Sequence, residues 1–440
     1  MSNRMRSFYA SGWFTTAVWL LRLCVGAVFV TSGLVKAIDL WGFVFKLEEY
    51  ALSFGFPQPR SVMVMTALFV SGYEFLFGFF LATGCFKRAA PWGLALMMLV
   101  MLPLSLYIAV ASPVSDCGCF GDFLIISNTA TFVKNLVLTA AIVALLFWNP
   151  KVRSGLFEPA IQWVAGVWTG LYLIIVALFG YNVQPMLDFR PFPIGTPLAP
   201  EEKADEDYLF VYQRGDETRS FPIDSIPEGD EWTFVDRVPR DGAPGKDTPD
   251  FAIFDGEYDV TESVISTDGW QFLLILPEPR KADISYTYAA NEIYQYADSA
   301  GIPMAALLAT DQRGIDSWLD LSMAGYPCYS VDDTQLKELS RGTMALVILR
   351  DGKVYSKEML SSIPLERIEA ARASGDMPRT LALNPVSTFR TLSGICVGGL
   401  LALYLFQGVI LGVRAKIRAA ARRRREKRLA AKASSGGNEK

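Results

Sequence analysis

Histidine is absent from the 440-residue sequence, and this absence excludes several kinds of functional site. Without an imidazole the chain cannot build a Ser-His-Asp triad, a zinc site with histidine ligands or a histidine-bound haem. It is also without the side chain whose ordinary pKa best suits a general base at neutral pH. Any chemistry must therefore use cysteine, carboxylate, amine or hydroxyl groups.

Charged residues are scarce: they make up 20% of the chain, against 51% hydrophobic residues, and the mean hydropathy is +0.27. This composition is typical of a membrane protein with soluble parts. A bilayer span needs about 20 apolar residues. Six runs are that long, at about 14–35, 61–83, 90–111, 128–148, 162–182 and 391–413. The first run is too long for a cleavable signal sequence, so we expect a retained helix.

Lys and Arg residues gather at one side of these spans. They precede the first span at Arg4 and Arg6, and they form the basic segment 414–432 after the last. The positive-inside rule therefore predicts cytoplasmic N- and C-termini. We interpret the basic segment as a topology anchor beside anionic lipid rather than as a nucleic-acid site. The polar segment 183–388 is then periplasmic, in a protein of the bacterial inner membrane.

Within the polar segment, apolar and polar residues alternate after a Pro-rich linker. This pattern predicts a small β-hairpin that turns at 214–216. From residue 250 onward, buried strands alternate with helices and end in a hairpin. The expected strands are 270–277, 302–310 and 327–332, the helices are 285–301, 314–325 and 333–342, and the hairpin is 344–359. This order resembles the thioredoxin fold, including "DF" at 250–251 and "DGKV" at 351–354.

The thioredoxin Cys-x-x-Cys is missing from the place where the resemblance requires it. Segment 277–284, which follows the first buried strand, contains no cysteine. Without a low-pKa thiolate there is no nucleophile for disulfide exchange. We therefore predict a binding or docking role for this domain. Its one cysteine, Cys328, is either a buried core residue or a resolving partner for Cys117 or Cys119.

Cys117 and Cys119 flank Gly118 in the stretch "SDCGCFGD", which the topology places on the external face between the third and fourth spans. A disulfide across one residue closes a small, strained ring, and strain makes a disulfide a better oxidant. Gly118 permits the backbone angles that such a ring requires. Three interpretations stay open: a redox-active pair, a structural disulfide or pair of thiols in a turn, and a metal site. Two thiolates with carboxylates form a poor zinc site, so we expect no metal.

Three of the charged side chains in or near the spans are candidate site residues. Lys36, at the outer end of the first span, is placed to favour the thiolate form of a nearby cysteine. Arg22 and Glu74 lie within the first and second spans, where charges are costly and need partners. Because these spans run in opposite directions, the two residues can pair. Such a pair either locks the bundle or forms a site for a quinone head group or a proton path.

The first four spans resemble the DoxX-like superfamily and, within it, the MauE branch of methylamine-utilisation accessory proteins. The resemblance covers about residues 15–148. It rests on "RLCVGAVFVTSGLVKAID" at 22–39, "SGYEFLFGFFLATG" at 71–84, "CGCFG" at 117–121 and "TFVKNLVL" at 131–138. The "DFRP" at 188–191 and the thioredoxin-like appendage resemble longer DoxX proteins of the Bacteroidetes type.

The resemblance implies a redox-associated membrane protein. MauE proteins are linked to maturation of a disulfide-rich periplasmic enzyme, and DoxX-like subunits to quinone-dependent oxidation of sulfur compounds. The plan is also similar to that of four-helix membrane oxidoreductases that generate disulfides.

The expected fold is an α-helical membrane protein that carries an α/β thioredoxin-like extracytoplasmic domain. Its expected parts are a MauE/DoxX-like domain at 1–148, a fifth span at 149–183, a β-rich linker region at 184–249, the thioredoxin-like domain at 250–370, a linker and sixth span at 371–413 and a basic tail at 414–440.

The favoured function is thiol–disulfide redox exchange through Cys117 and Cys119, with Lys36 assisting. Electrons would pass between thiols of a periplasmic protein and a membrane quinone near Glu74 and Arg22. The alternative is a non-catalytic assembly or maturation factor that docks a periplasmic client. A small-solute transporter is disfavoured, because the four-helix core is short and shows no inverted repeat.

Overall fold

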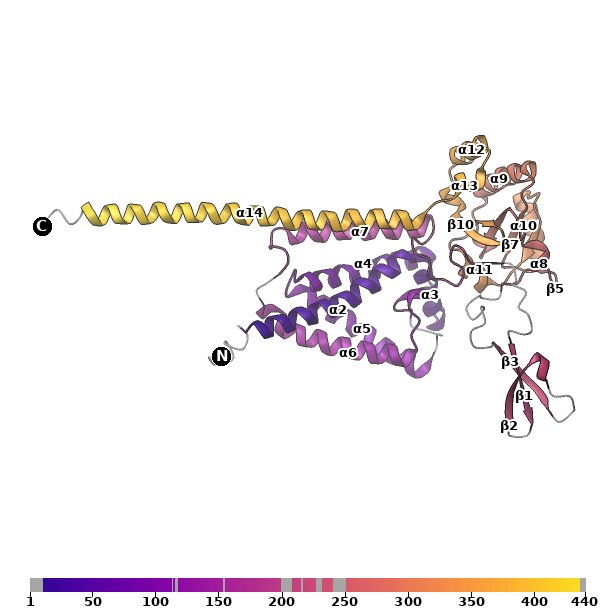
Figure 1. The fold of residues 1–440 in the computed structure, drawn as a ribbon, viewed down its shortest axis with the longest axis horizontal. Coiled ribbons are helices and arrows are strands. Elements are labelled where there is room, and N and C mark those ends of the chain that lie inside the picture. Colours follow the sequence, from indigo (N-terminus) through magenta and orange to yellow (C-terminus); the bar gives the residue numbers. More distant parts are fainter. Residues whose placement is uncertain are drawn as a thin grey trace. The chain divides into compact units, whose positions relative to one another are not determined.

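The computed structural model describes residues 11–112, 114, 118–152, 155–198, 208–214, 217–226, 232–239 and 251–435. The chain forms two compact units. Residues 1–181 and 385–440 make up the first, which is helical, and residues 182–384 make up the second, which contains the strands (Figure 1).

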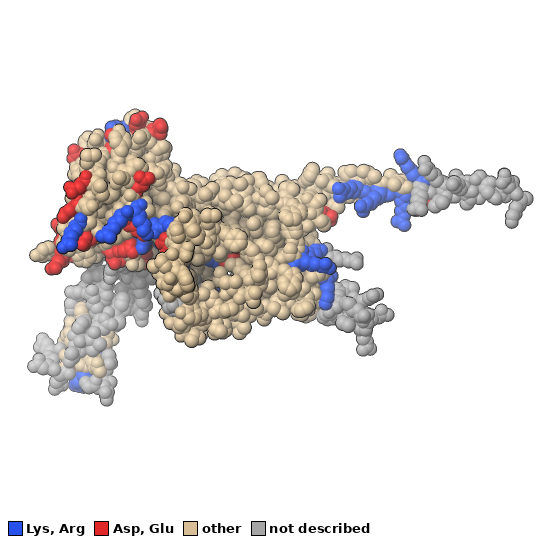
Figure 2. Space-filling view, turned by 180° about the vertical axis from the view of Figure 1, so that it is seen from behind, with Lys and Arg blue, Asp and Glu red and all other residues tan. Residues whose placement is uncertain are grey.

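The helical unit contains six helices that are long and apolar enough to cross a membrane, which confirms the six predicted spans. They are α2 (Gly12–Ile38), α4 (Arg60–Thr83), α5 (Ala89–Ala111), α6 (Asn128–Trp148), α7 (Gln162–Asn182) and α14 (Pro385–Ser435). Helices α7 and α14 lie side by side, and the indole of Trp168 donates a hydrogen bond to the Cys396 carbonyl at 3.1 Å (Figure 1). Lys and Arg side chains gather on the protruding end of α14 (Figure 2).

Glycines let the backbones of α2 and α4 approach closely. A Cβ atom built on Gly33 would lie 2.6 Å from the Phe75 nitrogen, and one on Gly78 would lie 2.8 Å from the Val30 nitrogen. Small residues drive helix association in membranes because they permit such backbone contact. These two contacts fix the register of α2 against α4, and with it the level at which their charged side chains meet.

A short helix, α3 (Leu40–Ser53), follows α2 and lies between the first two predicted spans. Its first turn is capped by the Asp39 side chain, which accepts a hydrogen bond from the Gly42 amide at 2.9 Å. Leu40, Phe43 and Val44 are buried on one face of α3. This helix was not predicted, because its short apolar stripe lies beside the much longer apolar run of the first span.

The second unit is built on a seven-stranded mixed sheet with the order β10-β9-β6-β7-β8-β4-β5. Its strands are β4 (Phe254–Asp255), β5 (Tyr258–Asp259), β6 (Trp270–Leu276), β7 (Met304–Leu308), β8 (Cys328–Ser330), β9 (Ala345–Arg350) and β10 (Lys353–Met359). Strands β6, β7 and β8 run parallel, and β9 pairs antiparallel with both β6 and β10. A separate three-stranded sheet, β2-β1-β3, contains the predicted hairpin; its strands are β1 (Tyr208–Arg214), β2 (Glu217–Pro222) and β3 (Thr233–Pro239).

Both faces of the large sheet are covered. Phe272 and Leu274 of β6 pack with helices α9 (Thr287–Ala300), α10 (Gln312–Ser322), α12 (Leu365–Ser374) and α13 (Met377–Leu381). The alternate residues Leu273 and Ile275 pack on the other face against α11 (Asp333–Leu339) and the segments around 192–198 and 251–265. A strand buried on both faces reads as a continuous apolar run, which is why "WQFLLIL" was predictable.

The order of strands and helices in this unit agrees with the sequence-based expectation at each element from β6 to β10. Gly301 is the C-cap of α9 and has a φ of 67°, in the left-handed region that glycine adopts readily. The turn between β9 and β10 falls at Asp351 and Gly352. The described elements thus form a mixed parallel and antiparallel sheet covered on both faces. The resemblance to the thioredoxin fold stays a prediction.

Candidate functional site

A cavity of about 110 Å³ lies at one end of the helical bundle, beneath the loop that carries Cys119. Residues from α2, α3, α4, α5 and α6 contribute to its walls, together with residues 118–120. The cavity brings together three of the predicted site residues, Lys36, Glu74 and Cys119. The other polar lining residues are Ser32, Lys134 and Asn135.

Lys36 and Glu74 form a buried ion pair in the cavity wall. The Lys36 ammonium lies 2.6 Å from a Glu74 carboxylate oxygen, and only 3% and 6% of the two side chains are exposed. The ammonium also lies 5.3 Å from the centre of the Phe43 ring of α3. Because both charges are removed from solvent, each stabilises the other where an isolated charge would be costly.

Ser32 connects this ion pair to the cysteine loop. Its hydroxyl oxygen lies 2.7 Å from Glu74 Oε2 and 2.7 Å from the Cys119 carbonyl oxygen, and it accepts a hydrogen bond from Lys36 at 2.8 Å. A serine hydroxyl carries one proton, so it donates to only one of the two oxygens at a time. The Ser32 hydroxyl therefore connects the Glu74 carboxylate and the loop carbonyl at one point.

Gly118 meets two structural demands at the centre of the cysteine motif. Its φ is +62°, in the left-handed region that glycine adopts without strain. A Cβ atom at this position would lie 2.7 Å from the Lys46 Cγ of α3. The loop and α3 thus pack tightly because residue 118 has no side chain.

Cys117, the other predicted cysteine of the site, lies outside the described residues. Within the residues that the structure describes, no group of three or more histidine, cysteine, aspartate or glutamate side chains is arranged to hold a metal ion.

Arg22 lies apart from this site, so the expected pairing of Arg22 with Glu74 is wrong. The Arg22 guanidinium is fully buried and donates hydrogen bonds to the side chain and the carbonyl of Asn149, the latter at 3.1 Å. It also lies 5.0 Å from the Trp19 ring. Glu74 instead meets Lys36, because the register of α2 against α4 brings Glu74 to the level of that lysine.

Lys134 was not predicted as a site residue, although its sequence context had been noted. Its ammonium lies 4.6 Å from the centre of the Phe120 ring, and Lys134 lines the cavity. Asn135, the next residue, is buried in the same wall. A polar Lys-Asn pair near the start of a membrane span is the signal that points to this position.

Cys328, in the second unit, lies on strand β8, between β7 and β4, and is half-buried. Burial raises the pKa of its thiol to about 12. A thiol with such a pKa is almost entirely protonated at neutral pH and is a poor nucleophile. This favours the core interpretation of Cys328 over the resolving one.

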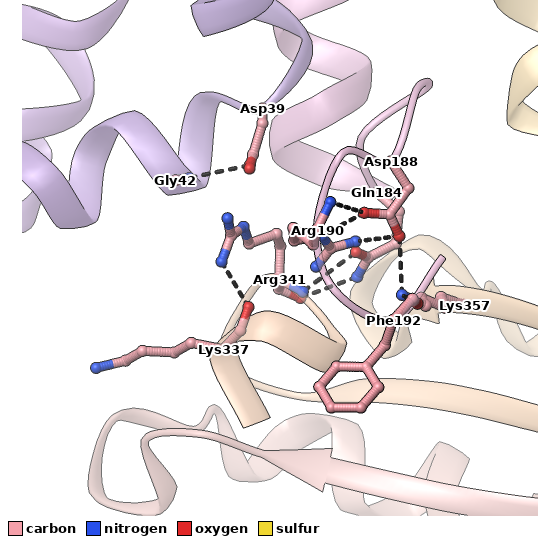
Figure 3. A network of polar contacts seen from close by, with 9 residues as sticks. All are labelled: Asp39, Gly42, Gln184, Asp188, Arg190, Phe192, Lys337, Arg341 and Lys357. Atoms are coloured by element: carbon pink, nitrogen blue, oxygen red, sulfur yellow. Dashed lines mark hydrogen bonds and ion pairs between the residues drawn. The ribbon is translucent and has the colours of Figure 1, made fainter. Parts of the chain in front are cut away.

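The second unit also holds a buried charge cluster around Asp188 (Figure 3). The carboxylate accepts hydrogen bonds from Arg190 at 2.6 Å and from Lys357 of β10 at 2.8 Å. Burial alone would raise the pKa of Asp188, but the two cations hold it well below its usual range. Gln184 donates to the Arg341 carbonyl and accepts from the Arg341 amide. These contacts anchor segment 184–192 to the large sheet.

Six apolar helices and a buried ion pair beneath a cysteine loop define a multi-span membrane protein with a polar site at one end of its bundle. Residues 14–148 match the family described as methylamine utilisation protein MauE, so this part of the chain is MauE-like. The match spans the four-helix bundle and the cysteine motif, which is under a third of the chain. No curated protein and no solved structure matches the chain.

Proposed function

We propose that this protein is a membrane thiol–disulfide redox protein in which Cys117 and Cys119 cycle between disulfide and dithiol. The observation that carries the proposal is the connection from the Cys119 carbonyl, through Ser32, to the buried Lys36–Glu74 pair. If the cysteine pair served only to close the turn, the fold would not require a buried ion pair beneath it, because burying two charges is energetically costly.

The proposed reaction moves two electrons and two protons in each half. The Cys117–Cys119 disulfide accepts them from two thiols of a client protein, which becomes a disulfide while the motif becomes a dithiol. The dithiol then passes two electrons and two protons to a membrane quinone, which becomes a hydroquinone. Lys36 and Glu74 are the groups placed to exchange protons at the cavity wall, and Lys134 adds a second cation to its lining.

The quinone step requires the cavity to widen. Ligand sites usually enclose roughly 300–1,000 Å³, whereas this cavity measures about 110 Å³. Helix α3 supplies the lining residues Phe43, Leu47 and Tyr50 and is the shortest helix of the wall. We propose that α3 moves outward to admit the quinone, and that Arg22 takes no part, since it is absent from the lining.

The second unit is proposed to bind the client in the periplasm. It carries one cysteine, Cys328, and the raised pKa of this thiol disfavours a redox role. The orientation with cytoplasmic termini, the inner-membrane location and the thioredoxin-like fold of this unit belong to the same proposal. The name of the matching family suggests methylamine utilisation as the process in which the client acts.

An assembly factor without redox turnover is the second candidate, and it is favoured by the absence of a Cys-x-x-Cys from segment 277–284. In that case the Cys-Gly-Cys motif has a purely structural role in closing the turn. Replacing both Cys117 and Cys119 by serine would then leave client maturation intact.

Single cysteine variants of the full chain separate the two candidates. Cys117→Ser or Cys119→Ser leaves one thiol that can attack the disulfide of an oxidised client, with release of one client thiol, but cannot resolve the adduct, so we expect one variant to accumulate a mixed disulfide that a reductant removes. Cys328→Ser is the matched control and should leave the adduct unchanged. Absence of an adduct from both single variants, with normal client maturation, would support the assembly factor instead.

A further inference from the structure

A second cavity, of about 620 Å³, lies at the other end of α4 and shares no lining residue with the cysteine cavity. It is formed where α4 ends, α5 begins and α7 begins. All three helices are membrane spans, so the cavity lies at the level of the lipid headgroups. Its polar lining residues include Lys87, Arg88, Glu158 and Gln162.

The walls of this cavity are held by hydrogen bonds between distant parts of the chain. The Gln162 side chain accepts a hydrogen bond from the Phe86 amide at 3.0 Å, and the Glu158 amide donates one to the Gln407 side chain of α14 at 2.6 Å. The Leu156 amide donates to the Thr83 carbonyl at 2.8 Å. A cavity fixed by three separate segments is preformed, and preformed sites bind with a smaller entropy cost.

The lining carries charges of both signs. Lys87 and Arg88 are adjacent cations in the turn between α4 and α5, and Glu158 precedes α7. Lys87 and Glu158 interact electrostatically. The apolar part of the lining comes from Phe86, Phe157 and Pro159. This arrangement fits a ligand with a phosphate, a nearby cation and an apolar body.

We propose that this cavity binds the headgroup of a phospholipid that carries a primary amine, that is, phosphatidylethanolamine. Lys87 and Arg88 contact the phosphate, and the Glu158 carboxylate accepts hydrogen bonds from the ammonium. A primary ammonium has three N–H donors for such an acceptor, whereas the quaternary ammonium of a choline lipid has none. An anionic lipid without an amine has no ammonium to donate hydrogen bonds to Glu158.

The test uses the full-length protein in nanodiscs that contain equal amounts of phosphatidylethanolamine, phosphatidylglycerol and phosphatidylcholine, the last being the N,N,N-trimethylated form of phosphatidylethanolamine. Lipid that stays bound on transfer to detergent is counted by native mass spectrometry. We expect retention of phosphatidylethanolamine to exceed that of the other two by about tenfold. This ratio corresponds to the free energy that one hydrogen bond to a charged group contributes.

Two variants and two controls assign the contacts. Arg88→Gln, at an exposed position, should lower retention of every phospholipid, whereas Glu158→Gln should abolish only the preference for the primary amine. The controls are Arg414→Gln and Glu426→Gln, which alter exposed charges of α14 beyond its apolar part. They should change neither the total retention of phospholipid nor the preference for the primary amine. Equal retention of the trimethylated lipid, stronger retention of phosphatidylglycerol, or an unchanged preference in Glu158→Gln would each overturn the proposal.

Discussion

The ammonium of Lys36 and the carboxylate of Glu74 lie 2.6 Å apart, on neighbouring membrane helices and almost wholly out of solvent. This pair forms the floor of the cavity beneath the cysteine loop, and Ser32 links it to the Cys119 carbonyl. The proposed function depends on this relationship, and most of the expected outcomes below test it.

Removing either charge of this pair should destabilise the bundle strongly. Lys36→Met or Glu74→Gln leaves the partner buried without compensation, so we expect a loss of about 3–5 kcal/mol in the free energy of unfolding. The double variant should recover much of the loss. The measurement is unfolding in detergent micelles. Lys46 and Glu49, a more exposed pair at 2.8 Å, provide the control, and Lys46→Met should cost less than about 1 kcal/mol. Equal costs for both pairs would contradict the buried arrangement.

Close approach of α2 and α4 is needed to bring Lys36 and Glu74 together. Gly78→Ala places a methyl group 2.8 Å from the Val30 nitrogen, so the helices must separate, at a cost of about 1–3 kcal/mol. Gly72→Ala, on the same helix, meets nothing within 4 Å and should be neutral or slightly stabilising. Thermal unfolding of the two variants compares them directly. A similar loss in Gly72→Ala would point to helix flexibility rather than packing.

Ser32→Ala should loosen the cysteine loop while leaving the bundle folded. The variant removes the group that contacts both Glu74 and the Cys119 carbonyl, and an unmade buried hydrogen bond costs about 1–3 kcal/mol. We expect faster alkylation of Cys119 and faster amide exchange at residues 118–123. Ser71→Ala is the control, because the Ser71 hydroxyl donates only within its own helix, to the Ala67 carbonyl. An unchanged rate of Cys119 alkylation in Ser32→Ala would show that Ser32 does not hold the cysteine loop.

The second unit should lose stability as the pH rises toward neutral because of Glu358. Burial raises the pKa of this carboxyl to about 7, and Arg367 opposes the rise only in part. The folded state therefore holds a proton that the unfolded state releases near pH 4.5, so this stabilisation is complete below pH 4.5 and is lost as the pH passes through 7.

The variant Glu358→Gln should remove this slope between pH 5 and pH 8. The readout is hydrogen exchange in α12 and α13, corrected for the intrinsic pH dependence of the exchange rate, with a change of about 1–3 kcal/mol expected in the parent. Glu366→Gln, an exposed neighbour in α12, should keep the slope. A slope that survives in Glu358→Gln would assign the pH dependence to other groups.

The spans and the elements of the large sheet were predictable because they depend on local pattern. Long apolar runs mark the helices, and a run such as "WQFLLIL" marks a strand buried on both faces. Helix α3 escaped prediction because its apolar stripe is short and lies beside a much longer run. Yet Asp39 and the residues after it carry an N-cap and an amphipathic pattern that would have identified it.

The pairing within the site could not be predicted, because it depends on register. At 1.5 Å per residue, Arg22 and Lys36 lie about 21 Å apart along α2, so Glu74 can reach only one of them. The close contacts at Gly33 and Gly78 set the register of α2 against α4, and this register brings Glu74 to Lys36. Sequence pattern places each charge within a span, but the level at which two helices meet is a property of their packing.

The central claim is that the Cys-Gly-Cys motif turns over, and its redox state in the intact protein tests this most directly. Purified full-length protein with Cys24, Cys85, Cys328 and Cys396 replaced by serine is reduced with a dithiol, exposed to a soluble quinone and labelled with a thiol-reactive mass tag. We expect two tags before the quinone and none after it, with slower oxidation in Glu74→Gln. If the motif takes the same number of tags under both conditions, the cysteine pair does not pass electrons to a quinone.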